Sequence, residues 1–229
     1  SAVEDILPQL KDSRNRPAAI RIARVLCLAA DDRYKEALTQ LNDLKTFLAS
    51  EDASSSAYDE SKDLPLYRAA ILLFEGRDYD AMRAAFRQYM DLNADDRDRV
   101  LARALGLVYA MHETVLGCQR LHELTGLLVG SEYLTDPDIK KSLSRLNVAS
   151  LLGMHQQSLG WCGRWDESAR LCLQIMDEYY PDTLSGANAA LGLAIYQLRI
   201  QKDLDAAERL LNDIVLRAPY DGVMPHVKT

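Results

Sequence analysis

The sequence predicts an all-α fold in which about five antiparallel helix pairs stack into a right-handed superhelix. A turn with a large residue near the start of a helix recurs at Tyr34, Tyr79, Trp165 and Leu204. These positions lie 45, 86 and 39 residues apart, and 86 is twice 43, so one unmarked pair fills the long interval. The chain is also poor in helix breakers, with 11 Gly and 7 Pro among 229 residues. Such pairs bury their apolar stripes only by stacking on neighbours.

The recurring turn is clearest over residues 162–169, Cys-Gly-Arg-Trp-Asp-Glu-Ser-Ala. A glycine loosens the turn, an aromatic residue follows, and two acidic residues begin the next helix. Acidic residues suit that first turn because free amide N–H groups and the helix dipole favour negative charge. Variants occur over residues 32–37, 76–81 and 202–207. The motif therefore predicts where the second helix of a pair begins.

Apolar residues at helical spacing predict the elements of the first half. A short helix is expected within residues 1–12, around Pro8. Pro17 suits the first turn of the next helix, where its missing N–H costs nothing. That helix is expected over residues 18–31, and further helices are expected over 34–49, 63–76 and 78–92. Twelve mostly polar residues, 51–62, predict a loop between the first two pairs.

The second half begins with Asp95 or Asp96, either of which can cap a helix that reaches His112. Asp136 followed by Pro137 is a capping residue with proline at the first helical position, so a long helix is expected from there to about Leu159. The remaining helices are expected over 115–129, 165–179, 183–201 and 203–217. We therefore predict one domain over residues 1–219 and a tail over 220–229.

The last unit resembles the tetratricopeptide repeat (TPR). Its apolar, small and proline positions match the 34-residue pattern at Leu191, Ala194, Leu198, Ala207, Leu211, Ile214 and Pro219. The other units share this register with longer helices or loops, at about 40–45 residues each, which lies within the range of longer helical hairpins. The resemblance implies TPR-like helix pairs.

Composition narrows the classes of function. The net charge of −7 argues against a nucleic-acid-binding protein, which is usually basic. The cysteines lie far apart without a CxxC pair, which predicts reduced thiols in a cytoplasmic protein: Cys27, Cys118, Cys162 and Cys172. No charged-then-apolar leader opens the chain and no run of 18 apolar residues occurs, so we expect no insertion into a membrane.

The sequence offers little chemistry for catalysis. It holds no phosphate-binding glycine motif, no HExxH motif and no Cys/His cluster. His112 and His122 are ten residues apart across a turn, and we interpret them as surface or helix-end residues rather than metal ligands. No pair of carboxylates stands out in an apolar setting. We therefore predict a protein that is not an enzyme and uses no cofactor or metal.

The first helix of each TPR-like pair lines a concave groove, which is where we expect partners to bind. The candidate residues are Leu64, Tyr67, Ile71, Phe74, Gln157, Tyr196 and Arg199. The first four form an apolar stripe in the second pair, where a solvated face would be polar. Either a neighbouring helix, such as residues 3–12, covers this stripe, or it receives a partner helix or extended peptide.

The fourth and last pairs present a different surface on the same face. Small residues recur there, at Gly153, Gly160, Ala189 and Gly192, with Gln157, Tyr196 and Arg199 as polar neighbours. Glycine is unfavourable inside a helix, so its use suggests a close approach of another backbone. We also expect Trp165 to be buried between its own helix pair and the preceding pair. Trp165→Ala should then lower the free energy of unfolding by about 3–5 kcal/mol.

Two stretches resemble the helical-repeat region of subunit 12 of the TRAPP vesicle-tethering complex. The first runs from Arg16 to Leu38, and the second joins residues 142–145, 152–154, 179–181, 191–193 and 206–208. The resemblance implies a non-catalytic scaffold subunit in endoplasmic-reticulum-to-Golgi traffic, placed in the cytoplasm and bound to other protein subunits in a hetero-oligomer. Residues 95–135 have no match. A second hypothesis is a helical-repeat sensor arm of a transcription regulator, whose concave face binds a small effector or a partner protein.

Overall fold

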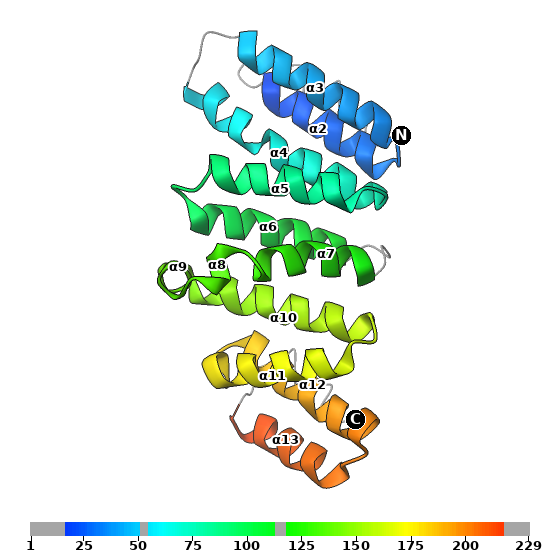
Figure 1. The fold of residues 1–229 in the computed structure, drawn as a ribbon, viewed down its shortest axis with the longest axis vertical. Coiled ribbons are helices and arrows are strands. Elements are labelled where there is room, and N and C mark those ends of the chain that lie inside the picture. The colour runs from blue at the N-terminus through cyan, green and yellow to red at the C-terminus, as the bar shows by residue number, and fades with distance from the viewer. Residues whose placement is uncertain (1–16, 51–54, 113–117, 218–229) are drawn as a thin grey trace. The chain divides into compact units, whose positions relative to one another are not determined.

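The computed structural model describes residues 17–50, 55–112 and 118–217, and every regular element in these ranges is a helix (Figure 1). The helices are α2 (Pro17–Ala30), α3 (Tyr34–Ser50), α4 (Ser55–Glu75), α5 (Tyr79–Leu92), α6 (Arg97–His112), α7 (Cys118–Val129), α8 (Glu132–Thr135), α9 (Pro137–Ser142), α10 (Arg145–Trp161), α11 (Trp165–Tyr179), α12 (Leu184–Tyr196), the π-helix η1 (Gln197–Gln201) and α13 (Leu204–Arg217). The predicted all-α class is confirmed. The helix expected within residues 1–12 and the tail over 220–229 lie outside the described residues.

The chain divides into two compact units, residues 1–100 and 101–229. The single domain over 1–219 stays a prediction, and the units are described one at a time. In the described part of the chain, no helix combines the length and the apolar character that crossing a bilayer requires.

The first unit contains two helix pairs, α2 with α3 and α4 with α5. Its main core joins α2, α3 and α4, and its buried members are Val25, Leu28, Ala29, Ala37, Leu41, Leu44, Leu48, Leu64 and Ile71. These residues recur at helical spacing, three, four or seven positions apart, which places them on one face of each helix. The apolar stripe of α4 is therefore covered by α2 and α3.

Helix α4 begins at Ser55, so the loop predicted over 51–62 is wrong for its last eight residues. Polar residues suggested a loop, but Ser, Asp and Glu are only modestly unfavourable within a helix. Contacts further along hold α4 in place. The buried Asp63 pairs with Arg99 at 3.4 Å, and the side-chain amide of Asn93 donates to the Lys62 carbonyl at 3.3 Å.

The second unit contains the pairs α10 with α11 and α12 with α13, and α7 packs on α10. The single helix predicted from Pro137 to Leu159 is wrong, because α9 ends at Ser142 and α10 begins at Arg145. Leu143 between them has extended backbone, and the Ser144 side chain accepts from the Asn147 amide at the start of α10. Serine favours this capping position over a helix interior.

The recurring sequence motif marks a shared backbone turn. Asp32, Gly76, Gly163 and Lys202 have φ values of 60°, 68°, 76° and 59°, all in the left-handed region. Residues in this conformation commonly end a helix. Each of these four residues precedes the second helix of a pair, so the prediction of where those helices begin is confirmed.

Candidate functional site

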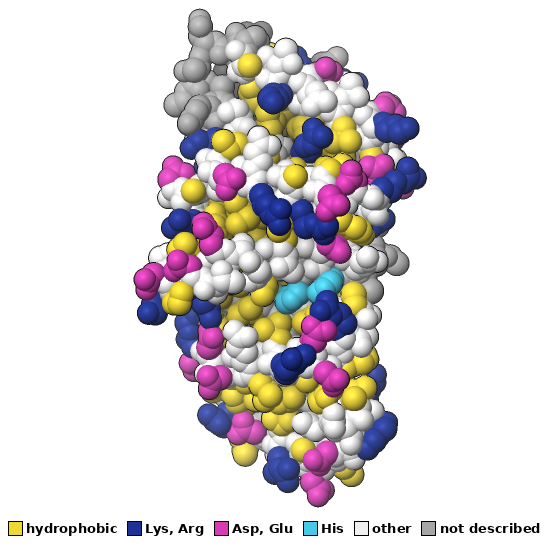
Figure 2. Space-filling view, in the orientation of Figure 1, with side chains coloured by type: hydrophobic (Ala, Val, Ile, Leu, Met, Phe, Trp, Pro, Cys, Tyr) yellow, Lys and Arg dark blue, Asp and Glu magenta, His cyan; other side chains and the backbone are white. Residues whose placement is uncertain are grey.

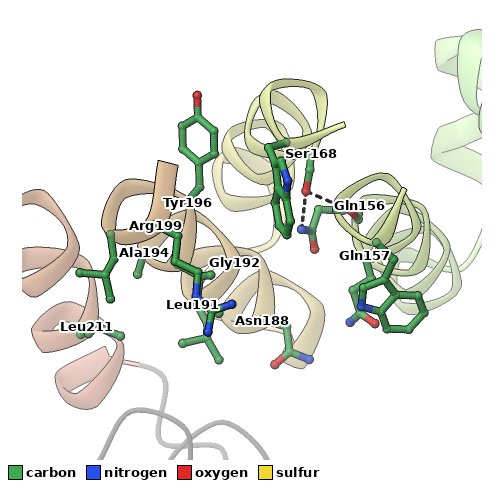
Figure 3. Close-up of a pocket in the computed structure, with 15 residues that line it drawn as sticks. Gln156, Gln157, Ser168, Asn188, Leu191, Gly192, Ala194, Tyr196, Arg199 and Leu211 are labelled. Atoms are coloured by element: carbon green, nitrogen blue, oxygen red, sulfur yellow. Dashed lines mark hydrogen bonds between the residues drawn. The ribbon is translucent and has the colours of Figure 1, made fainter. Parts of the chain in front are cut away.

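The second unit is hollowed by two adjoining pockets that share Gln157 and Asn188. We call them together the α10–α12 groove. The larger pocket is drawn in Figure 3; its lining comes from α10, the start of α11, α12, η1 and α13. The smaller one extends the groove along the N-terminal halves of α10 and α12.

Helix α10 forms one wall of the groove through a single face. Leu146, Ser150, Gly153, Gln157 and Trp161 line it at intervals of three or four residues. This is the spacing that keeps side chains on one side of an α-helix. Trp161 and Leu146 remain 53% and 66% exposed, so the apolar surface here is open.

Helix α12 and the π-helix form the facing wall. Leu184, Asn188, Leu191, Ile195 and Leu198 follow at the same intervals. Leu184, Ile195 and Leu198 are exposed. The groove thus presents apolar side chains along both walls, and Gln157 and Asn188 bring one amide from each.

Glycines let the surrounding helices approach closely. A methyl group at Gly192 would lie 3.1 Å from the Gln156 amide nitrogen and 3.2 Å from the Cys172 sulfur. One at Gly160 would lie 3.4 Å from the Trp165 ring. The neighbours at both positions are side chains, so the close approach of another backbone that the glycine pattern predicts is not found there.

A buried hydrogen-bonded pair lines the larger pocket between α10 and α11 (Figure 3). The Gln156 amide donates to the Ser168 hydroxyl at 2.8 Å, and that hydroxyl donates back to the Gln156 carbonyl at 3.1 Å. The pair ties α10 to α11. It leaves the neighbouring Gln157 on the groove side.

The two shared amides are free within the described structure. Gln157 and Asn188 are half-buried, and neither makes a hydrogen bond to any described residue. Each amide offers a carbonyl acceptor and an NH₂ donor. Because they line one groove from facing helices, they place two amides that bond to no described residue in a mainly apolar site.

Near η1, the rim of the groove holds a hydrogen-bonded group around Tyr196 and, beside it, the side chain of Arg199. The Tyr196 hydroxyl donates to Asp166 at 2.6 Å and accepts from the Gln201 amide at 2.6 Å. The bond to Asp166 raises the pKa of Tyr196. Arg199 is exposed and has no ion pair or hydrogen bond with any described residue, and its side chain lines the same pocket (Figure 3).

The structure separates the seven predicted partner-binding residues into two groups. Gln157, Tyr196 and Arg199 line the α10–α12 groove. Leu64 and Ile71 lie in the core of the first unit, 8% and 0% exposed, so they offer no surface to a partner. Tyr67 is half-buried against that core, and Phe74, at the end of the same helix, is half-buried as well.

The sequence-based interpretation chose the groove-facing residues of α12 with an error of one position. It placed Ala189 on the groove face of α12, whereas Ala189 is buried and Asn188 faces the groove. The spacing of Leu184, Asn188, Leu191 and Ile195 could have shown this face. The burial predicted for Trp165 is only partial: its ring lies against Gly160 of its own helix pair, but the residue is 39% exposed and lines the groove.

A second cluster, away from the groove lining, joins two stacked histidines. The rings of His122 on α7 and His155 on α10 lie 5.2 Å apart and nearly parallel. Thr125 donates to the Leu121 carbonyl and lies 3.0 Å from His155 Nδ1, so His155 donates to it. Figure 2 shows histidine side chains on the surface beside basic and acidic ones.

The surroundings lower the pKa of both histidines in this cluster. Burial lowers the pKa of His155 to about 4, and the neighbouring His122 and Arg164 add to the effect. Burial also lowers the pKa of His122. Arg164 is only a donor, so His122 Nε2 accepts from it and the ring carries its proton on Nδ1. Within the described ranges, no group of three or more His, Cys, Asp or Glu residues could hold a metal ion.

Comparisons with known proteins assign this chain to no family. No protein-family model and no curated protein matches it. A crystal structure of nearly identical TPR-like repeats from Podosopora anserina, assigned to a kinesin light chain, is similar at 14% sequence identity. It covers 88% of this chain and 95% of its own, with a TM-score of 0.47. This degree of likeness supports no inference about function.

Proposed function

We propose that the protein is a non-catalytic interaction scaffold whose α10–α12 groove binds an extended segment of a partner protein. One observation carries the proposal: Gln157 and Asn188, whose amides bond to no described residue, line a groove that is otherwise mainly apolar. Burying such amides without partners costs free energy. A ligand that supplies both hydrogen-bond donors and acceptors is therefore favoured.

The amides favour an extended ligand over a helical one. An α-helix satisfies its own N–H and C=O groups internally, so its sides offer no main-chain partners. An extended segment presents free N–H and C=O groups at every residue. Two amides on facing walls match this pattern, while alternate side chains of the segment can contact the apolar walls.

Exposed aromatic and aliphatic side chains supply the binding surface. Trp161 and Trp165 are 53% and 39% exposed, and Leu198 is 46% exposed. Tryptophan commonly carries a large share of the energy at protein interfaces. Large exposed apolar patches of this kind mark interaction sites in soluble proteins.

The two tryptophans make the proposal directly testable, because the chain has only these two and both line the groove. Nine-residue peptides selected from a random library on the immobilised protein should shift the tryptophan emission on titration. The double variant Gln157→Ala, Asn188→Ala should bind about thirtyfold more weakly, since it loses two hydrogen bonds of roughly 1 kcal/mol each. Asn212→Ala removes an exposed amide of α13 outside the groove and should bind as the parent does. Failure to select any peptide would contradict the proposal.

The resemblance to TRAPP subunit 12 supports a more specific version of this proposal, the finer form. In it, the protein is a cytoplasmic subunit of a hetero-oligomeric tethering complex at endoplasmic-reticulum and Golgi membranes. The most specific part of the resemblance joins residues 179–181, at the end of α11 and in the turn into α12, to residues 191–193 of α12 and 206–208 of α13. There the Tyr179 carbonyl approaches Gly186 so closely that an added methyl group would lie 2.5 Å away. Affinity purification of the tagged chain with mass spectrometry should recover other tethering subunits. Recovery of unrelated partners would reject the finer form and leave the groove proposal standing.

A small effector is the alternative ligand, as in the sensor arm of a transcription regulator. The larger pocket, at about 990 Å³, lies at the upper end of the volumes that small-molecule sites occupy. An effector would be enclosed in this pocket alone. A peptide would also contact the smaller pocket, so Leu146→Ala and Leu184→Ala should weaken peptide binding and leave effector binding unchanged.

A further inference from the structure

We propose that the segment received by the α10–α12 groove carries one acidic side chain, bound by Arg199, next to a bulky apolar residue that packs against Trp161, Trp165 and Leu198. This inference rests on the proposed function and specifies the chemistry of the partner. It follows from the charge, the local backbone and the apolar surface at the η1 end of the groove.

The charge at this end of the groove comes from one residue. Among all the described residues that line either of the two pockets, Arg199 is the one with a charged side chain. It is exposed and forms no ion pair or hydrogen bond with the described residues. Its guanidinium presents a planar set of donors that matches a carboxylate. A carboxylate is therefore the group that complements this site.

The nearby polar groups leave Arg199 available. Asp166 already accepts a hydrogen bond from the Tyr196 hydroxyl, which in turn accepts one from Gln201. These contacts hold the Tyr196 ring between the start of α11 and η1. Arg199 remains outside this network, although Tyr196 lies only three residues before it.

The π-helix brings an apolar side chain and the cation into the groove together. Leu198 and Arg199 are consecutive residues of η1, and both line the pocket. The wider π turn ends at Lys202, which has left-handed backbone. Single π turns within α-helices occur frequently at functional sites. A ligand that meets both residues therefore needs an acidic group and an apolar group close together.

The apolar contact at this end is large. Trp161 comes from the end of α10, Trp165 from the start of α11, Leu198 from η1 and Leu211 from α13. Four elements thus contribute large apolar side chains to the larger pocket. A bulky side chain would bury part of the two indole rings, where aromatic surface contributes strongly to affinity.

The overall charge limits how acidic the segment can be. The chain carries a net charge of −7, so a run of acidic residues would be repelled by the molecule as a whole. One carboxylate close to Arg199 gains the local contact and incurs little of that repulsion. We therefore expect a single acidic position rather than an acidic tract.

An oriented peptide library tests the proposal on the full chain. Nine-residue peptides with a fixed central leucine and randomised flanking positions are selected on the immobilised protein, and the recovered sequences are counted. Asp or Glu should be enriched at one position beside the leucine, and Lys and Arg should be depleted there. Selection on Arg199→Gln should lose this enrichment. Selection on Arg209→Gln, which changes an exposed arginine of α13 outside the groove, should retain it.

A double-mutant cycle assigns the contact. Replacing the selected Asp by Asn in the best peptide should weaken binding to the parent protein about tenfold and binding to Arg199→Gln less than twofold. Tryptophan emission measures the binding of each peptide. Enrichment that Arg199→Gln leaves unchanged, or an equal loss on both proteins, would overturn the inference. Recovery of apolar peptides without an acidic position would overturn it while supporting the peptide-binding groove. Recovery of no peptide at all would overturn the proposed function itself.

Discussion

At the scale of single residues, Trp165 shows how one side chain serves both the fold and the groove. One edge of its ring lies over Gly160, where a methyl group would come within 3.4 Å, while the residue stays 39% exposed. Trp165→Ala should therefore lower the free energy of unfolding by about 1–2 kcal/mol, less than for a fully buried tryptophan. Urea unfolding followed by circular dichroism measures this. A loss above about 3 kcal/mol would contradict the partial exposure.

His155 gives the stability a pH dependence of known sign. Its pKa is about 4 in the folded protein, below the ordinary value of 6.5, mainly because it is buried. As the pH falls, the unfolded chain takes up this proton first, so stability is full above pH 6.5 and is lost towards pH 4. The loss is about 3 kcal/mol for this group.

The variant His155→Gln isolates this contribution, because glutamine can still donate to Thr125 but does not titrate. Its free energy of unfolding should fall less steeply than that of the parent between pH 6.5 and pH 4, as measured by urea melts at each pH. Parallel slopes for the two proteins would show that His155 is not held neutral by the fold.

At the scale of helices, the turn between α11 and α12 depends on one glycine. A methyl group at Gly186 would lie 2.5 Å from the Tyr179 carbonyl oxygen, which belongs to the backbone and cannot move alone. Gly186→Ala should therefore destabilise the protein by about 3 kcal/mol or more, in the range of severe packing strain.

Gly106, within α6, is the matched control because nothing lies within 4 Å of an added methyl group there. Gly106→Ala should stabilise the protein by about 0.5–1 kcal/mol, the helix preference of alanine over glycine. Thermal melts of both variants test the pair of expectations. Equal effects of the two substitutions would show that the close approach at Gly186 does not control stability.

Helical spacing predicted most of the helices because it records which side chains are buried together. It failed where backbone detail decides the outcome. Ser55–Lys62 is helical although polar, Leu143 interrupts a predicted helix, and η1 widens into a π turn. None of these changes the apolar pattern of the sequence, so periodicity does not distinguish them.

The same reasoning explains what could be predicted of the site. Gln157, Tyr196 and Arg199 follow from placing the first helix of each pair on a groove. An apolar stripe, however, does not reveal which neighbour covers it. Leu64 and Ile71 match the groove pattern of α4, but α2 and α3 bury them. Asn188 was missed because an error of one residue rotates the chosen face of a helix by about 100°.

At the scale of the whole molecule, helix-pair repeats are stabilised mainly by contacts between neighbours. The two compact units of this chain divide after Val100, and both tryptophans belong to the second. Tryptophan emission therefore reports on the second unit, whereas circular dichroism reports on all helices. This gives a direct test of whether residues 1–219 unfold as the single domain that the sequence predicts.

The substitution Leu44→Ala removes a fully buried side chain from the core of the first unit and should cost about 2–5 kcal/mol there. If the two units unfold separately, the circular-dichroism transition should broaden to lower urea concentrations while the tryptophan transition keeps its midpoint. Ile175→Ala, an equally buried change in the second unit, should move the tryptophan transition instead. Peptide binding by the groove should survive Leu44→Ala at urea concentrations that unfold the first unit, because every described residue that lines the groove lies beyond Val100. A common shift of both signals in both variants would show one cooperative domain.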